Sequence, residues 1–231
     1  MTVVYILAHF DDEYCGLPLV TAAVAAGEDQ LFLYVADYRT PDLAQRRHAE
    51  SQALLAHLGV DPAKVVHAGR GAGAVDGAVH RALPAAYAAL GAALADVGPI
   101  SRIVVTAWEG GHMDHDMCAL MATDIAATHG NPPIETISLY NGPRLPSIFF
   151  HGGWPLPQNG PIRRVRVGPA AWLSWMAAVR FFPSQTKTWL GLWPAMFWSY
   201  AWRGFGVQTL DPARVRERPH PGALFYERMF K

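Results

Sequence analysis

Hydrophobic positions in the first 140 residues of the chain alternate between two patterns. Short continuous runs, several of them rich in β-branched residues, predict buried strands at 3–8, 31–36, 65–67, 103–107 and 134–139. Between them, apolar side chains recur at helical spacing and predict helices at 17–26, 43–58, 79–97 and 118–127. This order predicts an α/β fold, in which helices cover both faces of a mostly parallel sheet in a three-layer Rossmann-like arrangement.

The regular pattern weakens after Tyr140. Residues 141–161 are rich in proline and glycine and predict a long loop, followed by a helix at 172–180. Aromatic residues crowd into 189–205, where Gly191 and Pro194 predict a loop or a short helix rather than a continuous one. We expect a single domain over 1–231, with an α/β core at 1–140 and an irregular, aromatic C-terminal part at 141–231.

Two polar clusters follow predicted strands directly. The first holds His9, Asp11, Asp12 and Glu13, and the second spans 109–116. Because the carboxyl ends of parallel strands lie at one edge of a sheet, the two clusters meet on the same rim. Crowded carboxylates call for a neutralising cation, and two histidines with one carboxylate are a common catalytic zinc set. Each cluster alone fits a helix cap or ordinary structural histidines, but together they predict a metal site.

The residues of these clusters resemble a known family. Ala8-His9-Phe10-Asp11-Asp12-Glu13 and His112-Met113-Asp114-His115 are similar to the paired motifs of the LmbE-like, or PIG-L, family of zinc-dependent amino-sugar N-deacetylases. Those motifs are Ala-His-Pro-Asp-Asp-Glu and His-Pro-Asp-His. Arg47-x-x-Glu50 and Pro183-Ser184-Gln185 are supporting matches. The resemblance covers residues 1–140 well and the remainder loosely.

The resemblance implies a role for each matching residue. His9, Asp12 and His115 would hold Zn²⁺, although Fe²⁺ suits the same ligands. Asp11 would be the general base that activates the attacking water and later protonates the leaving amine. His112 would stabilise the tetrahedral oxyanion, and Asp114 would orient His112.

Further residues are candidates for substrate contacts or for support of the site. They are Glu13, Arg47, Glu50, Glu109 and Gln185. We expect Arg47 and Glu50 to form an ion pair, and Glu109 to contribute to the site or to cap a turn. Phe10 and Met113 replace the prolines of the family motifs, which we expect to leave the ligand set intact. Gly110 stands where some relatives have a tyrosine.

The resemblance implies hydrolysis of the N-acetyl or another N-acyl group of a glucosamine-type sugar or sugar conjugate, with release of acetate and a free amine. One alternative is a zinc amidase that acts on a non-sugar amide. The other is a catalytically silent metal- or sugar-binding module. Retention of Asp11 beside three ligands argues against the silent module, because a binding protein needs no base.

The composition of the chain bears on which classes of partner the protein can bind. The 231 residues have a formal net charge of zero and no basic run, which argues against a nucleic-acid partner. Two cysteines and the absence of a signal-like N-terminus predict a cytoplasmic protein without a disulfide framework. The aromatic segment 189–205 leaves two alternatives open. It is either core, or an apolar wall that contacts a lipid-linked part of the substrate or a membrane surface, in which case Trp193→Ala and Trp198→Ala spare stability.

Overall fold

The computed structural model describes residues 1–141 and 152–229. Within these ranges a seven-stranded sheet has the order β3-β2-β1-β4-β5-β7-β6. The strands are β1 (Thr2–Leu7), β2 (Asp29–Tyr34), β3 (Val65–Val66), β4 (Ile100–Thr106), β5 (Ile134–Ile137), β6 (Ile162–Val165) and β7 (Phe205–Thr209). The first five are parallel, whereas β7 is antiparallel to β5 and to β6. The predicted α/β class and mostly parallel sheet are confirmed.

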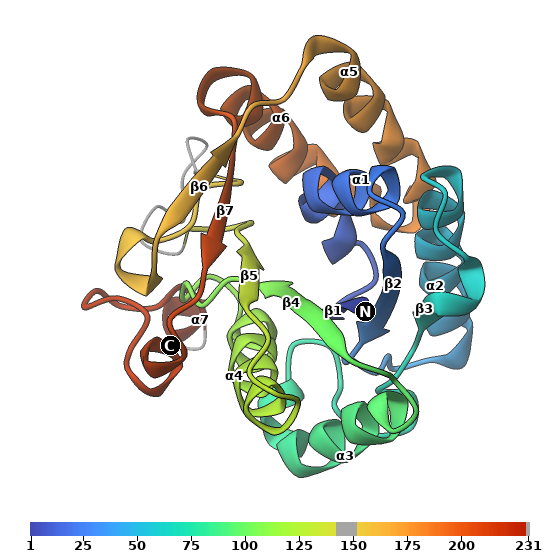
Figure 1. The fold of residues 1–231 in the computed structure, drawn as a ribbon, viewed down its shortest axis with the longest axis vertical. Coiled ribbons are helices and arrows are strands. Elements are labelled where there is room, and N and C mark those ends of the chain that lie inside the picture. Colours follow the sequence, from blue (N-terminus) through green and yellow to red (C-terminus); the bar gives the residue numbers. More distant parts are fainter. Residues whose placement is uncertain (142–151, 230–231) are drawn as a thin grey trace.

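Helices cover both faces of the sheet, as the apolar strand runs predict. They are α1 (Leu17–Ala25), α2 (Pro41–His57), α3 (Leu83–Leu94), α4 (Met113–Thr128), α5 (Pro169–Ala177), α6 (Thr186–Arg203) and α7 (Phe225–Met229). Successive residues of β1 face opposite sides. Tyr5 and Leu7 pack in the core with α1, α2, α5 and α6, and Val4 and Ile6 pack in the core with α3 and α4. Figure 1 shows the resulting three layers.

The C-terminal part is more regular than predicted. It adds β6 and β7 to the sheet and two long helices, α5 and α6, to one face (Figure 1). The expectation of a loop or short helix at 189–205 is wrong, because α6 continues through Gly191 and Pro194. Pro194 removes a hydrogen bond to the carbonyl of Leu190, but both residues lie on the exposed side of the helix. The opposite side buries aromatic rings, which stabilises the helix against this loss. Of the predicted loop at 141–161, residues 142–151 lie outside the described ranges.

Two helix starts differ from the sequence prediction in ways that shape the site. The helix predicted at 118–127 begins at Met113, because His112 caps it and its Nδ1 accepts the main-chain N–H of Asp114 at 3.2 Å. His115 therefore lies in the first turn of α4. The segment predicted as one helix at 79–97 instead forms a 3₁₀ turn, Val79–Ala82, followed by α3. Pro84 lies in the first turn of α3, where proline is favoured.

In the described residues, every helix falls short of the length and apolar character needed to cross a membrane.

Candidate active site

The first polar cluster forms a tight, strained loop at the carboxyl end of β1. His9 follows the strand closely, and Asp11 has a backbone φ of 114°, a conformation that residues other than glycine rarely adopt. The loop then enters a 3₁₀ helix, Asp12–Gly16. Backbone strain of this kind persists where the surroundings fix it, and it concentrates at functional sites.

The predicted ligands His9, Asp12 and His115 come together, as the shared rim of the sheet requires. Asp12 Oδ1 lies 3.1 Å from His115 Nε2, and Asp12 Oδ2 lies 3.7 Å from His9 Nδ1. All three side chains are buried. Neither ring nitrogen of His115 has a hydrogen bond within the described part of the chain. Two ligands of one tetrahedral ion, each about 2.0–2.1 Å from it, lie roughly 3.3 Å apart. The two Asp12 contacts are near this spacing, and His9, Asp12 and His115 stay the predicted ligand set.

A second carboxylate set surrounds the other side of His9. Its Nε2 lies 3.1 Å from Asp114 Oδ2 and 3.3 Å from Asp76 Oδ1. Potential ligand atoms of His9, Asp76, His112 and Asp114 lie within 4.8 Å of one another, as do those of His9, His112 and His115. The sequence analysis missed Asp76. The available signal was a carboxylate in the loop after β3, which ends at the same rim of the sheet as β1 and β4.

Asp114 contacts a different histidine from the one that the family resemblance implies. Its carboxylate lies against His9 and accepts the main-chain N–H groups of Gly77, at 2.6 Å, and Val79, at 3.0 Å. Only its own main-chain N–H contacts His112. The reason is that Asp114 lies in the first turn of α4, next to the Gly77–Val79 segment. Asp114 thus joins the loop after β3 to the loop after β1.

His112 presents a hydrogen-bond donor to the site. Because its Nδ1 accepts the Asp114 N–H, the neutral ring carries its proton on Nε2. Burial and the neighbouring His9 lower the pKa of His112 to about 3, so this neutral form is the one present at pH 7. The His112 and His9 rings meet edge to face, with their centroids 4.8 Å apart.

Asp11 is buried beside these rings. Its burial, together with the adjacent charge of Asp12, raises the pKa of its carboxyl group well above the ordinary range. The Asp11 main-chain N–H donates to Glu13 Oε2 at 3.1 Å, so Glu13 lies behind the loop and supports its shape. A carboxyl group with an elevated pKa is suited to accept and return a proton near neutral pH.

The predicted Arg47–Glu50 ion pair is wrong. Arg47 Nη1 lies 3.5 Å from Asp76 Oδ2, and its guanidinium stacks over the Tyr38 ring at 5.2 Å. Glu50 instead accepts the N–H of Ser184 at 2.9 Å and its hydroxyl at 2.6 Å. These residues separate because Arg47 faces the site, whereas Glu50 faces the turn that precedes α6.

The Ser184–Gln185 turn ties the C-terminal part to the metal loop. Gln185 Nε2 donates to the carbonyl of Phe10 at 2.8 Å. Phe10 also donates its main-chain N–H to the Tyr38 hydroxyl at 3.0 Å, a hydrogen bond that a proline at this position would lack. The Phe10 ring packs against the Tyr34 ring with their centroids 4.4 Å apart, so this departure from the family motif adds packing to the loop.

Glu109 contacts the segment that follows β5, at the edge of the site. Its buried carboxylate accepts the hydroxyl of Ser138 at 2.6 Å and the N–H of Tyr140 at 2.7 Å. These bonds fix the Tyr140 ring, whose centroid lies 5.4 Å from that of His115 and 6.2 Å from that of His112. Tyr140 is a further site residue that the motif comparison missed, because it follows β5 and belongs to neither cluster.

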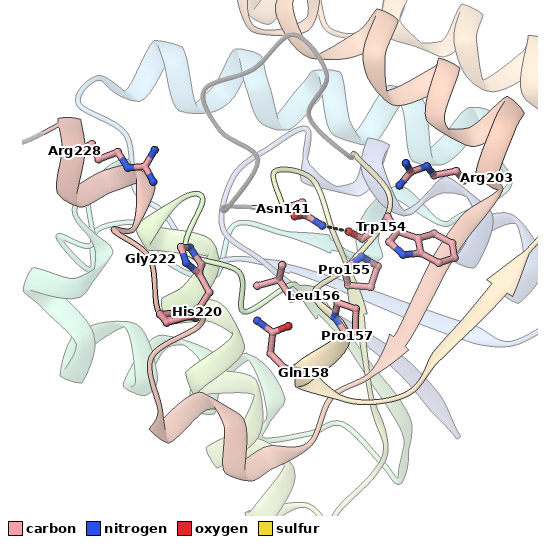
Figure 2. Close-up of a pocket in the computed structure, with 11 residues that line it drawn as sticks. Asn141, Trp154, Pro155, Leu156, Pro157, Gln158, Arg203, His220, Gly222 and Arg228 are labelled. Carbon is pink, nitrogen blue, oxygen red and sulfur yellow. Dashed lines mark hydrogen bonds between the residues drawn. The ribbon is translucent and has the colours of Figure 1, made fainter.

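These side chains line one cavity of about 180 Å³. Its lining combines the polar side chains of His9, Asp11, Asp12, Arg47, Asp76, His112, Gln185 and Thr188 with Leu139, Tyr140, Trp189 and Leu192. A larger cavity of about 570 Å³ lies between Trp154 and His220 (Figure 2). No Asp or Glu lines that larger cavity within the described ranges, so the carboxyl groups of the site belong to the smaller one.

Solved structures share this fold. The zinc-inhibited form of teicoplanin deacetylase Orf2 is 19% identical with a TM-score of 0.63, covering 91% of this chain and 97% of that one. The N,N'-diacetylchitobiose deacetylase of Pyrococcus horikoshii is 14% identical with a TM-score of 0.60, covering 95% and 87%. The chain has a deacetylase-like fold.

The fold by itself does not fix the reaction. GalB, the 4-carboxy-2-hydroxymuconate hydratase of Pseudomonas putida KT2440, also aligns, at 12% identity and a TM-score of 0.50, over 84% of this chain and 83% of that one. No protein-family model and no curated protein sequence matches the chain. The function must therefore be argued from the residues of the site.

Proposed function

We propose that the protein is a metal-dependent hydrolase that removes the N-acetyl or another N-acyl group from a glucosamine-type sugar or sugar conjugate. The products are acetate, or the corresponding acid, and a free amine. The observation that carries this proposal is that Asp11 and His112 line the same cavity as His9 and Asp12. A base and an oxyanion donor beside a metal set are what amide hydrolysis requires.

In this proposal His9, Asp12 and His115 hold the ion, which is Zn²⁺ or Fe²⁺. A divalent ion supplies a Lewis acid for the acyl carbonyl and lowers the pKa of water. Asp114 orients His9 through the 3.1 Å contact with Nε2, which leaves Nδ1 beside Asp12 to face the ion. The pairing of a histidine ligand with a carboxylate on its other nitrogen is the usual support of a metal-binding imidazole.

Asp11 is assigned the proton transfers. Its carboxylate takes a proton from the water that attacks the acyl carbon, and returns it to the nitrogen as the C–N bond breaks. Its raised pKa matches this task, since the group must hold the proton between the two steps. The strained backbone at Asp11 keeps the carboxylate at the cavity rather than in the position of a helix cap.

His112 is assigned the role of stabilising the oxyanion. The N–H on its Nε2 is the donor that remains after Nδ1 has capped α4. Negative charge develops on the acyl oxygen during attack, and a fixed donor stabilises this charge more than it stabilises the substrate. Because the capping bond holds the ring in place, little reorganisation accompanies the reaction.

The remaining walls are proposed to bind the sugar. Arg47 and Asp76 offer a donor and an acceptor for hydroxyl groups on one side of the cavity. Tyr140 and Trp189 offer aromatic surface in the same cavity, and aromatic rings pack well on the faces of sugar rings. The names of the solved neighbours support the same substrate class, because one deacetylates diacetylchitobiose and the other is a teicoplanin deacetylase.

The test is a screen of N-acetylated sugars, from N-acetylglucosamine and diacetylchitobiose to N-acylated glycoconjugates, with detection of released free amine. The Asp11→Asn protein is the matched control. We expect amine release from at least one sugar, and release ~10²–10⁴-fold slower from the control. Hydrolysis of non-sugar amides only would assign the site to an amidase. Hydration of an unsaturated acid without any amide hydrolysis would assign it to the hydratase class of the fold.

A further inference from the structure

Helix α6 has two faces of different character. One face is buried, with Trp189, Phe197 and Tyr200 each 2% exposed. The opposite face, here called the outer face of α6, repeats every three or four residues and is exposed throughout. It consists of Lys187, Leu190, Gly191, Pro194, Trp198, Ala201 and Trp202. Apart from Lys187, this outer face carries no charged or hydrogen-bonding side chain except the indole N–H groups of its tryptophans.

The apolar side chains of the outer face are unusually open. Trp198 is 73% exposed, Trp202 is 78% exposed and Leu190 is 73% exposed, while Leu173 of the adjacent α5 is 60% exposed. Elsewhere in the described chain, Met1 is the large hydrophobic residue with comparable exposure. Single exposed apolar residues are ordinary, but several on one helical face mark an interaction surface.

The chain segment that carries this surface holds charge of one sign. Between Pro161 and Gly204 the sequence has no Asp or Glu, although the whole chain has a net charge of zero. The same stretch holds Arg163, Arg164, Arg166, Arg180, Lys187 and Arg203. Arg164 donates to the carbonyl of Trp202 at 3.2 Å, which places a cation at one end of the outer face. Arg163 is paired with Glu135, but Arg166, Arg180 and Lys187 are exposed.

We propose that the outer face of α6, with the adjacent α5, docks peripherally on an anionic lipid bilayer. Tryptophan side chains favour the interface between lipid and water, and Arg and Lys beside them favour anionic headgroups. The proposal requires docking rather than insertion, because α6 is not apolar enough over its length to span a bilayer and buries its other face in the protein. Figure 1 shows α5 and α6 side by side at one end of the molecule, with α3 at the other.

The docking surface and the catalytic cavity share a helix. Thr188, Trp189 and Leu192 of α6 line the cavity, while Leu190 and Trp198 belong to the outer face. A bilayer on the outer face would therefore lie beside the cavity without covering Asp11 or His112. The inference rests on the surface of α6 and not on the proposed reaction, so each can fail without the other.

The experiment measures sedimentation of the full chain with vesicles of phosphatidylcholine, with and without phosphatidylglycerol. The test variants are the double substitution Trp198→Ser with Trp202→Ser, and the single substitution Lys187→Gln, which removes the cation of the outer face itself. Arg81→Gln is the charge-matched control, because Arg81 is exposed in the 3₁₀ turn on the opposite face of the sheet. Thermal unfolding of each variant checks that the fold is intact.

We expect the wild-type chain to bind vesicles that contain phosphatidylglycerol and to release as salt is raised. The double tryptophan variant should bind at least about tenfold more weakly. Lys187→Gln should bind up to about fivefold more weakly, and Arg81→Gln should bind as the wild type does. Three results would overturn the proposal: no binding by the wild type, equal binding by the folded tryptophan variant, or self-association that the same variant abolishes in the absence of any lipid binding.

Discussion

The carboxylate of Asp114 lies 3.1 Å from His9 Nε2, although the two residues are 105 positions apart in the chain. The same carboxylate accepts two main-chain N–H groups from the Gly77–Val79 segment. One buried side chain thus links the loops after β1 and β3 to the first turn of α4. In the proposed site it fixes the ring of a metal ligand.

Replacing Asp114 tests that relationship. Asp114→Ala should weaken metal binding by ~10–100-fold, since support of a ligand's second nitrogen typically contributes that much. It should also lower the free energy of unfolding by about 1–3 kcal/mol, because the N–H groups of Gly77 and Val79 lose their acceptor. Competition with a fluorescent chelator measures the first effect, and chemical denaturation measures the second. Asp114→Asn, which keeps a carbonyl acceptor, should recover part of both, and unaltered metal affinity in the alanine variant would contradict the assignment.

Asp11→Asn tests whether Asp11 acts as the general base without contributing to metal binding. The amide cannot accept the proton of water, so turnover should fall by ~10²–10⁴-fold while metal content stays at the wild-type level. Steady-state rates of amine release, combined with metal analysis of the same sample, measure both quantities. A variant that keeps the wild-type rate would leave Asp11 with a structural role only.

His112→Ala tests the oxyanion donor. Loss of one such donor costs roughly 10²–10³-fold in kcat, and KM should change far less because the donor acts mainly on the transition state. His112 also caps α4, so His112→Asn is the matched variant that can keep a capping acceptor without the Nε2–H donor. Comparable kcat losses in both variants are expected, whereas recovery of kcat by asparagine would show that capping, and not the oxyanion, explains the loss.

The loss of stability on replacing a tryptophan of α6 should depend on how deeply its side chain is buried. Trp189→Ala should lower the free energy of unfolding by about 3–5 kcal/mol, because Trp189 is 2% exposed and packs on Tyr14 and Phe182. Trp198→Ala should change it by less than about 0.5 kcal/mol. Trp193 packs partly on the core and donates to the carbonyl of Met176 at 3.2 Å. We therefore expect Trp193→Ala to reduce stability, as the core alternative for this segment predicts. Equal effects of Trp189→Ala and Trp198→Ala in urea denaturation would contradict the orientation of α6.

The meeting of the two polar clusters at one rim of the sheet could be predicted, because local sequence patterns determine the strands that they follow. Apolar runs place β1 and β4 in a parallel sheet, and His9 and the 109–116 cluster follow those strands in the chain. Their meeting is a consequence of topology rather than of side-chain detail. The same argument could have included Asp76, but a lone carboxylate in a glycine-rich loop has no local signal that separates it from an ordinary turn.

Other features depend on tertiary packing that the sequence pattern does not encode. Arg47 and Glu50 are spaced as a helical ion pair, yet each finds a partner from a distant segment, Asp76 and Ser184. Pro194 predicts a helix break, yet buried aromatic rings on the opposite side keep α6 continuous. In both cases long-range contacts outweigh a local preference, which is about 0.2–0.5 kcal/mol for a helical ion pair and about 3 kcal/mol for proline inside a helix.

The most direct test of the proposed function is amine release by chelator-treated protein as Zn²⁺ is added back. The substrate is the N-acetylated sugar that gives the highest rate in the screen, and His115→Ala is measured in parallel. The account predicts no turnover without metal, a rise that is complete near one ion per chain, and no recovery in His115→Ala. Full turnover in the metal-free protein, or full recovery of the His115→Ala variant, would contradict it.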